Sequence, residues 1–214
     1  MTLRRTLMLW ALGWLCAAAY AQGDERDAPG AVIANGVFLV AQPSLTEPTF
    51  RRTVILLTQP PGSGPMGIII NRPTDQTLAD VLPQHPALAA QTQPLYFGGP
   101  VARQGLVFLV RTQVAPPRSL RVLDDVYLMT DAAWVEQALA AGLPAGVPKI
   151  EVRVYAGYSG WVPGQLQNEL KRDGWYIVPA GSAAIFEGDL NKLWAELARR
   201  AVLKATSFKI QQNQ

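Results

Sequence analysis

Short apolar runs rich in β-branched residues alternate with turn residues from position 37 onward. Runs of this length and composition are typical of β-strands, and several are apolar at consecutive positions, which indicates strands buried on both faces. The expected strands are Val37–Ala41, Thr53–Thr58, Gly67–Asn71, Leu95–Phe97, Leu106–Arg111, Val126–Thr130 and Ile150–Tyr155. The pattern therefore predicts a mixed sheet that helices cover.

Four segments have the apolar spacing or the end signals of α-helices. The longest, Asp189–Leu203, places Leu190, Trp194 and Leu197 on one face, as expected of an amphipathic helix packed on a core. Asp131 and Gly142 mark the ends of a second helix, and Pro163 and Gly174 mark the ends of a third. The remaining expected helices are Asp131–Ala140, Pro163–Lys171 and the weaker Gln76–Leu82.

Length and composition fit one folded domain. The chain has 214 residues, of which 49% are hydrophobic, enough to bury one substantial core. We expect an α+β fold over residues 36–204, with a mixed, largely buried β-sheet, open or barrel-like, flanked by helices. Residues 22–35 are polar and predict a flexible lead-in, and residues 205–214 are expected to be a frayed tail.

The first 21 residues have the three parts of a signal peptide. Arg4 and Arg5 precede an apolar stretch, and Ala19-Tyr20-Ala21 places small residues where a cleavage site needs them. The apolar stretch is shorter than the roughly 20 residues of a transmembrane helix. We therefore expect cleavage after Ala21 and export to the periplasm, by the Sec route or, through the paired arginines, by the twin-arginine route. No membrane span is expected after cleavage, and the protein stays cytosolic if the leader is not used.

Removing the leader changes the charge and the cysteine content. The whole chain has a formal net charge of +3, but two of its 19 Lys and Arg residues lie in the leader, so the remainder nearly balances the 16 Asp and Glu. A strong attraction to nucleic acid or anionic lipid does not follow. Cys16, the only cysteine, leaves with the leader and follows Trp14-Leu15 instead of the small residues of a lipidation site. No disulfide, thiol chemistry or lipid anchor is expected.

Two glycine-containing motifs resemble sites for a cofactor or a nucleophile. Gly62–Gly67 matches the G-x-G-x-x-G dinucleotide pattern, but a proline interrupts it, and β-branched residues follow where a helix is needed to hold a pyrophosphate. A hairpin loop without a cofactor is expected there. The segment Gly157–Trp161 stands where a hydrolase would carry its nucleophile, but Trp161 replaces the glycine that such a turn requires.

Residues that would complete a catalytic or metal site are scarce. The single histidine, His85, lies in a proline-flanked loop, which disfavours a Ser–His pair, whereas Ser159 paired with a Lys or with Glu169 stays open. With one histidine and no mature cysteine, the usual ligand sets of zinc and iron cannot form. Asp124, Asp125 and Asp131 lack the spacing of a tight calcium site. No metal and no other cofactor are therefore expected.

The segment 161–175 is the densest in polar and aromatic side chains. Gln165 and Glu169 are four positions apart and share one helical face, opposite leucines that should pack inward. This polar pair beside two tryptophans indicates either a binding groove or a partly buried structural cluster.

Five blocks of the sequence together resemble the AlgH/YqgE family, in the same order and with similar spacing. The blocks are Phe38–Pro43, Pro48–Val54, Gly67–Pro73, Tyr96–Val101 and Gly157–Leu170, and the resemblance covers roughly residues 36–200. It implies an α+β fold around a mixed sheet, no established enzymatic activity and a historical label as transcriptional regulator. The chain departs from the family at Val110-Arg111, where relatives tend to carry a histidine. It departs also in its leader, since the family is chiefly cytosolic.

Loops that follow buried strands are the expected place for a site, because a rigid scaffold presents functional groups there. Within the resembling blocks, Asn71-Arg72 can close a turn and offer a cationic fork, and Gly98-Gly99 suits a sharp turn. We expect the candidate ligand- or partner-binding residues to lie near one another at the end of the sheet. They are Asn71, Arg72, Gly98, Gly99, Tyr158, Trp161, Gln165 and Glu169.

These observations favour an exported, non-enzymatic protein of the cell envelope that binds an unidentified small ligand or protein partner in a regulatory role. Two alternatives stay open: an unrecognised serine-type hydrolase acting through Ser159, and the transcriptional regulator of the family label. A nucleic-acid partner is disfavoured by the leader and because the sequence carries neither a strongly basic face nor a helix-turn-helix signature.

Overall fold

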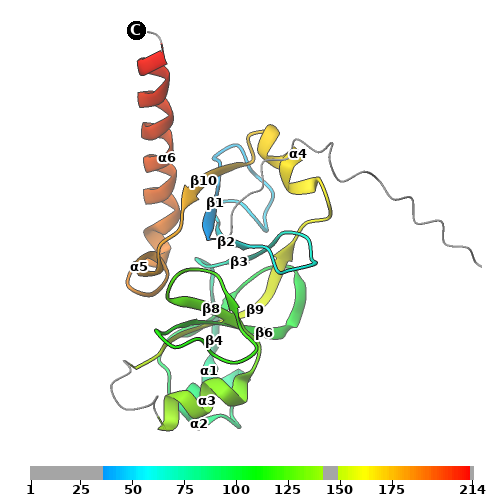
Figure 1. The fold of residues 1–214 in the computed structure, drawn as a ribbon, viewed down its shortest axis with the longest axis vertical. Helices are drawn as coiled ribbons and strands as arrows, with labels where there is room; N and C mark the ends of the chain where they lie inside the picture. Colours follow the sequence, from blue (N-terminus) through cyan, green and yellow to red (C-terminus); the bar gives the residue numbers. More distant parts are fainter. Residues whose placement is uncertain (1–35, 142–148, 213–214) are drawn as a thin grey trace, which may run out of the picture. The chain divides into compact units, whose positions relative to one another are not determined.

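A ten-stranded mixed sheet organises the part of the chain that the structure, a computed structural model, describes (Figure 1). The described residues are 36–141 and 149–212, with side chains as far as residue 204. Hydrogen-bonded neighbours follow the order β10-β1-β2-β3-β9-β6-β8-β7, and β4 and β5 join this path through β9. The pair β5–β9 is parallel and the other pairs are antiparallel, so the predicted mixed sheet is confirmed.

The apolar runs predict most of the strands but not those that are polar or very short. The bounds are β1 Val37–Ala41, β2 Val54–Thr58, β3 Met66–Ile69, β4 Pro73–Thr77, β5 Pro94–Phe97, β6 Val101–Arg111, β7 Leu120–Arg121, β8 Val126–Met129, β9 Glu151–Gly160 and β10 Trp175–Pro179. Three strands were not expected. β4 is polar and largely exposed, β7 has two residues, and β10 lies at the end of the strand path, where only its first residue, Trp175, is fully buried.

The three stronger helix predictions are confirmed with shifted ends. The helices are α1 Leu78–Val81, α2 Pro86–Ala89, α3 Ala132–Ala141, α4 Gln165–Lys171, α5 Ser182–Phe186 and α6 Leu190–Gln212. The weaker candidate is reduced to one turn, α1, because the residues before it belong to β4; Thr77 caps it through a hydrogen-bonded box with Asp80. The backbone of α6 continues past Leu203 to Gln212, and the frayed tail stays a prediction.

Alternate residues of the central strands enter different hydrophobic clusters. Phe38 of β1 and Leu109 of β6 belong to the cluster that includes residues of α5 and α6. Leu39 of β1 packs in the cluster that includes α4, whereas Phe108 of β6 packs in the cluster that includes α1, α2 and α3. In Figure 1, α5 and α6 lie at the left of the strands, α4 lies at the upper right, and α1, α2 and α3 lie below. The expectation of a sheet covered on both faces is therefore confirmed.

Strand β9 connects the two halves of the sheet. Most of its length pairs with β6, and its last residues, Ser159 and Gly160, pair with β3. Between these regions Gly157 has φ +72°, and a Cβ there would lie 2.5 Å from the carbonyl oxygen of Gly99. Only glycine fits this crossing. As a result, the end of β9 lies against the turn that follows β5 and beside the β2–β3 hairpin.

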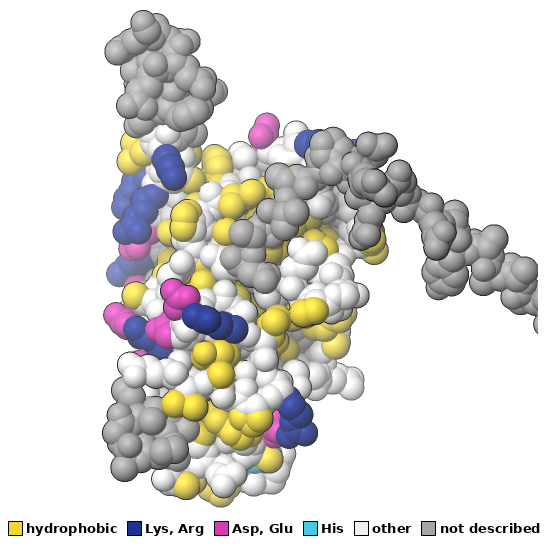
Figure 2. Space-filling model, viewed as in Figure 1, with side chains coloured by type: hydrophobic (Ala, Val, Ile, Leu, Met, Phe, Trp, Pro, Cys, Tyr) yellow, Lys and Arg dark blue, Asp and Glu magenta, His cyan; other side chains and the backbone are white. Residues whose placement is uncertain are grey.

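The predicted leader and lead-in, residues 1–35, lie outside the described residues, so export remains a prediction. Where the chain is described, none of its helices combines the length and the apolar character needed to cross a membrane. The longest, α6, instead carries Lys and Arg side chains along the face visible in Figure 2.

Candidate functional site

The expected site residues fall into two groups that different networks hold. Asn71 and Arg72, after β3, bind the loop of residues 47–53, whereas Trp161 and Gln165, after β9, both bind Glu169. Across the described residues, no hydrogen bond or ion pair joins Arg72 to the second group. The two groups meet indirectly through aromatic packing, because Phe50 of the loop lies edge-on to Trp175, with 5.9 Å between ring centroids.

Asn71 holds the loop to the start of β2. Its Oδ1 accepts a hydrogen bond from the Val54 backbone N–H at 2.8 Å, and its Nδ2 donates to the Arg52 carbonyl at 3.0 Å. Val54 is fully buried, so its N–H depends on this side chain for a partner. Instead of closing the turn after its own strand, as the sequence suggested, the Asn71 side chain bridges to Arg52 and Val54 earlier in the chain.

Arg72 is also committed to the loop. Its guanidinium donates to the carbonyl oxygens of Thr49 at 2.6 Å, Arg51 at 3.2 Å and Pro48 at 3.4 Å. Burial lowers the pKa of Arg72 below its ordinary value, the charge of Arg51 lowers it further, and Glu47 opposes both. Because backbone carbonyls already occupy the cationic fork, the geometry favours a structural role for Arg72 over anion binding.

Gly98 and Gly99 allow two backbones to meet. A Cβ on Gly98 would overlap the carbonyl oxygen of Gly157, and one on Gly99 would overlap the backbone of Tyr158. The Gly98 N–H donates to Ala156 at 2.8 Å, and its carbonyl accepts from Ile69 at 2.9 Å. These glycines join β9 and β3, and a side chain at either position would force the strands apart.

Glu169, on α4, is the acceptor at the centre of the second group. Its Oε2 accepts the indole N–H groups of Trp161 at 3.0 Å and Trp175 at 2.9 Å, and its Oε1 accepts from Gln165 Nε2 at 3.0 Å. Gln165 in turn accepts from the Val162 backbone N–H at 3.2 Å. Both indoles are buried, so the carboxylate satisfies donors that would otherwise lack partners. Of the two interpretations of this segment, a binding groove or a partly buried structural cluster, these contacts form the structural cluster.

A groove lies beside this cluster, where Tyr158 and Trp161 face the β2–β3 hairpin. Its volume is about 360 Å³, at the small end of the range for ligand sites. None of the described residues that line it is charged, and most are apolar, including Pro60, Met66 and Val162. Val162 is 67% exposed at its rim. The groove is therefore suited to an uncharged, largely apolar group. A binding groove was the other interpretation of this segment, and it lies beside the structural cluster.

The position of Trp161 depends on a glycine in β3. The Cζ3 atom of Trp161 would lie 3.3 Å from a Cβ placed on Gly67, and the same Cβ would overlap the side chain of Ile55. The indole ring therefore lies close over the strand at a point where no side chain intervenes. Gly67 ends the segment that matched the dinucleotide pattern, and the structure confirms that this segment joins two antiparallel strands.

Ser159 lacks the surroundings of a nucleophile. It is 1% exposed, and its Oγ has no hydrogen-bond partner among the described residues. The oxygens of Glu169 are engaged by Trp161, Trp175 and Gln165, so the Ser159–Glu169 pair of the hydrolase alternative does not form. A nucleophile requires both a base within hydrogen-bond reach and access for substrate.

The histidine and the acidic residues do not converge. His85 precedes α2 as its N-terminal capping residue and makes no side-chain capping bond. Asp124 pairs with Arg121 at 2.9 Å, and Asp131 caps α3 through the Trp134 N–H at 3.0 Å. In the described part of the chain, no group of three or more His, Cys, Asp or Glu side chains could hold a metal ion.

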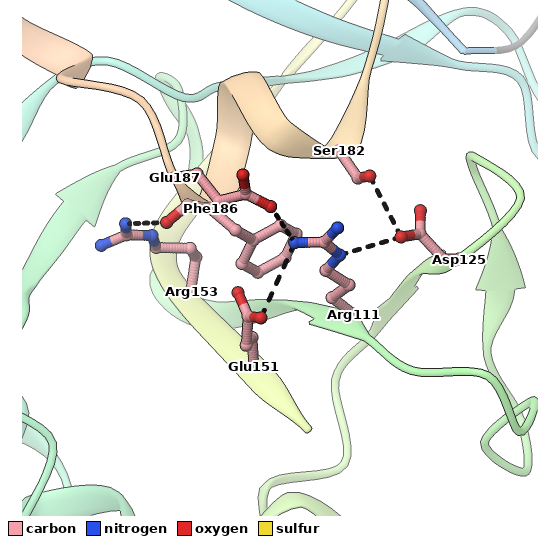
Figure 3. A network of polar contacts seen from close by, with 7 residues as sticks. All are labelled: Arg111, Asp125, Glu151, Arg153, Ser182, Phe186 and Glu187. Atoms are coloured by element: carbon pink, nitrogen blue, oxygen red, sulfur yellow. Dashed lines mark hydrogen bonds and ion pairs between the residues drawn. The ribbon is translucent and has the colours of Figure 1, made fainter. Parts of the chain in front are cut away.

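Sequence reasoning missed a charged network around Arg111, at the end of β6 (Figure 3). Arg111 forms ion pairs with Glu187 at 2.6 Å, Asp125 at 2.9 Å and Glu151 at 3.6 Å. Ser182 donates to the same Asp125 at 3.0 Å, so both ends of α5 are tied to the sheet. The hydrogen bond to Glu187, followed by that to Asp125, raises the pKa of Arg111.

The position of Arg111 explains why no local pattern reveals this network. Its partners come from three other segments, the farthest 76 positions away. A nearby arginine, Arg153, donates to the Phe186 carbonyl at 3.1 Å and also to Gln93 and Tyr96 at 3.1 Å. The only sequence signal was a cation at the end of an apolar strand.

Comparison with known proteins gives a consistent result. A family model described as AlgH-like matches residues 38–205. A UPF0301 protein from Nocardia farcinica is 39% identical over 177 residues, which cover 80% of this chain and 79% of the relative. A UPF0301 protein from Mycobacterium avium is 38% identical over 186 residues, which cover 84% of this chain and 89% of the relative.

Solved structures agree with the sequence comparisons. The solution structure of the AlgH protein from Pseudomonas aeruginosa has a TM-score of 0.62 and 28% identity, covering 80% of this chain and 92% of that chain. A crystal structure of a protein from Corynebacterium diphtheriae has a TM-score of 0.65 and 27% identity, covering 78% of this chain and 86% of that chain. The sheet and its covering helices are therefore similar to those of these proteins.

Proposed function

The chain belongs to the AlgH-like family, and from this premise we propose that it acts in the cell envelope by binding a partner polypeptide rather than by catalysis. The observation that carries the proposal is the uncharged groove between Tyr158, Trp161 and the β2–β3 hairpin. An apolar side chain of the partner occupies this groove. The family membership supplies the fold, and the groove supplies the binding chemistry.

The lining of the groove supports a polypeptide as the ligand. Tyr, Trp and Met are enriched at protein interfaces, where they offer contact area at low conformational cost, and the groove contains Tyr158, Trp161 and Met66. Two exposed valines that line the groove, Val101 at 39% and Val162 at 67%, extend its apolar surface to the rim. A polypeptide can cover such a rim, whereas a small molecule inside the groove would leave it in water.

The wall of the groove is held in place before any ligand arrives. Glu169 fixes the indole of Trp161 by a hydrogen bond of 3.0 Å, and Gln165 fixes the backbone at Val162. Groups that are ordered in advance lose less conformational entropy on binding, which leaves more of the contact energy for affinity. Glu169 and Gln165 are thus positioning residues, and Trp161 and Val162 make the contact.

A displayed library of short random peptides, selected on the purified protein, tests the groove. Selected peptides should carry an aromatic or aliphatic anchor and should bind Val162→Asp at least about tenfold more weakly, because a carboxylate would have to be desolvated in the groove. Ile177→Asp is the matched control, since Ile177 is 50% exposed on β10 and does not line the groove. Equal loss of binding in both variants, or no loss in either, would contradict the proposal.

The envelope location rests on the leader and is tested separately. We expect full-length protein expressed in its bacterial host to be recovered from the periplasm with Gln22 at its N-terminus, as read by intact mass. Recovery from the cytosol with Met1 retained would overturn the location and would reopen the regulator alternative, because a periplasmic protein has no access to the chromosome. The peptide-binding result does not depend on this outcome.

A further inference from the structure

A second pocket lies on another part of the molecule, between the loop of residues 47–53 and α6. Its volume is about 350 Å³, and its lining includes Arg51, Arg52 and Trp194 together with Gln42, Leu45 and Thr46. The guanidinium carbon of Arg52 lies 5.5 Å from the centre of the Trp194 ring, in a cation–π contact. The Trp194 indole N–H donates to the Ala41 carbonyl at 2.8 Å, so the ring is fixed on β1.

The backbone that presents the two arginines is held in an unusual conformation. Arg52 has φ +56°, a region that residues with a Cβ adopt at a cost. Asn71 secures the Arg52 carbonyl at 3.0 Å, and Arg72 secures the Arg51 carbonyl at 3.2 Å. The hydrogen bonds from Asn71 and Arg72 therefore maintain a strained turn, and this turn places the side chains of Arg51 and Arg52 at one pocket.

The two arginines of this pocket have no ion-pair partner among the residues whose side chains are described. None of the pocket residues is acidic, and Arg51 lies close enough to Arg72 for the two like charges to interact. The helix that carries Trp194 adds further cations, since exposed Arg199 and Arg200 follow within two turns and Figure 2 shows basic side chains along α6.

We propose that the pocket of Arg51, Arg52 and Trp194 binds the phosphate group of a phosphate monoester. Two adjacent guanidinium groups match a doubly charged phosphate in charge and in hydrogen-bond geometry. The Thr46 hydroxyl and the Gln42 amide offer neutral donors, and Leu45 with Trp194 forms an apolar surface for the group that carries the phosphate. This site is separate from the groove at Trp161 and takes a ligand of opposite character.

Titration with phenyl phosphate tests the proposal, because it is a phosphate monoester whose ring is small enough to enter the pocket beside Leu45 while its phosphate reaches the arginines. Binding to the purified protein is followed by NMR at the Trp194 indole N–H, assigned through Trp194→Phe. We expect saturable binding that weakens as salt rises, and an affinity about tenfold lower in Arg51→Gln and in Arg52→Gln. Arg52→Lys keeps the charge but loses the planar fork, so an intermediate affinity is expected.

Arg103→Gln is the matched control, since Arg103 is exposed and lies 5.6 Å from the Phe97 ring in an equivalent cation–π contact. Its affinity should stay within about twofold of wild type, because Arg103 does not line the pocket. Thermal unfolding of each variant identifies any loss of fold. Unsaturable binding, or equal affinity in wild type, Arg51→Gln and Arg52→Gln, would overturn the proposal.

Vesicles distinguish a soluble ligand from a lipid headgroup. Phosphatidylcholine vesicles with and without phosphatidic acid, whose headgroup is a phosphate monoester, are sedimented with wild type and Arg52→Gln. Arginine-dependent binding to phosphatidic acid vesicles supports the site with a lipid as the source of the phosphate. Arginine-dependent binding to phenyl phosphate alone supports it with a soluble source. Binding to neither ligand would refute it.

Discussion

Replacing Glu169 by alanine should destabilise the protein through two indole N–H groups. Trp161 and Trp175 are 7% and 5% exposed, and both donate to the same carboxylate oxygen. A buried donor left without a partner costs about 1–3 kcal/mol, so two cost about 2–6 kcal/mol. Glu169 is itself partly exposed, and water entering the vacated space recovers part of this loss. We therefore expect a decrease of about 2–3 kcal/mol in the free energy of unfolding.

Glu169→Gln separates the hydrogen bonds from the charge. One amide oxygen in the position of Oε2 can still accept from both indoles, but without the added strength of a charged acceptor. The Gln165 amide would then face a second amide donor. A loss of about 1 kcal/mol is expected for this variant. For a domain of this size each kcal/mol corresponds to a shift of about 2–4 °C in Tm, so the two variants should be resolved by thermal unfolding.

Urea unfolding followed by near-ultraviolet circular dichroism measures both the stability and the tryptophan environment. Glu196→Ala is the control, because Glu196 is an exposed carboxylate on α6 and should change stability by less than about 0.5 kcal/mol. If Glu169→Ala matched Glu196→Ala, the indole groups would have other partners and the reasoning would be refuted. A normal free energy of unfolding with an altered tryptophan spectrum would refute it too, since the ring would then move at no cost.

Three further changes test other parts of the fold. Asn71→Ala should cost about 1–3 kcal/mol in urea unfolding, because the buried Val54 N–H loses its acceptor, while Asn71→Asp keeps an acceptor and should cost less. Arg111→Met should lower stability by about 1 kcal/mol at low salt and less in 1 M NaCl, since the network around it is partly exposed and screened. The Thr77 hydroxyl and backbone N–H hold the pKa of Asp80 below its ordinary value of 3.8. This carboxylate therefore stabilises the fold above that pH and loses its effect as the pH falls through the folded-state pKa, so the stability difference between wild type and Asp80→Asn should shrink on acidification.

The sequence predicts those parts of the fold whose signal is local. The run at β1 was placed with its observed bounds, because five apolar residues between turns leave few alternatives. β4 has the sequence Pro-Thr-Asp-Gln-Thr and is a strand only because it pairs with β5. The central place of β9, between β3 and β6, depends on pairings between strands far apart in the chain. The spacing of apolar residues along one strand does not indicate which other strands it pairs with.

The candidate site divides in the same way. The spacing of Gln165 and Glu169 predicted side chains on one helical face, and the bond of 3.0 Å between them confirms it. The hydrogen bonds from Trp161 and Trp175 to Glu169 could not be predicted in the same way. The sequence left open both a binding groove and a structural cluster, because a pattern gives the types of neighbouring residues and not their contacts. The cationic fork of Arg72, which the sequence suggested would be open to a ligand, instead binds backbone carbonyls up to 24 positions earlier in the chain. The network of Arg111 could not be read from any single segment.

The residues that carry the family resemblance mostly position other side chains. Asn71 and Arg72 hold the carbonyls of the loop that presents Arg51 and Arg52. In the second group, Glu169 holds the indole that forms the wall of the groove. In both places a half-buried polar group holds the backbone or ring beside an exposed side chain that one of the two proposals assigns to ligand contact. The two proposals therefore imply that a change at the exposed positions alters binding without loss of the fold, whereas a change at the anchoring positions lowers stability and binding together.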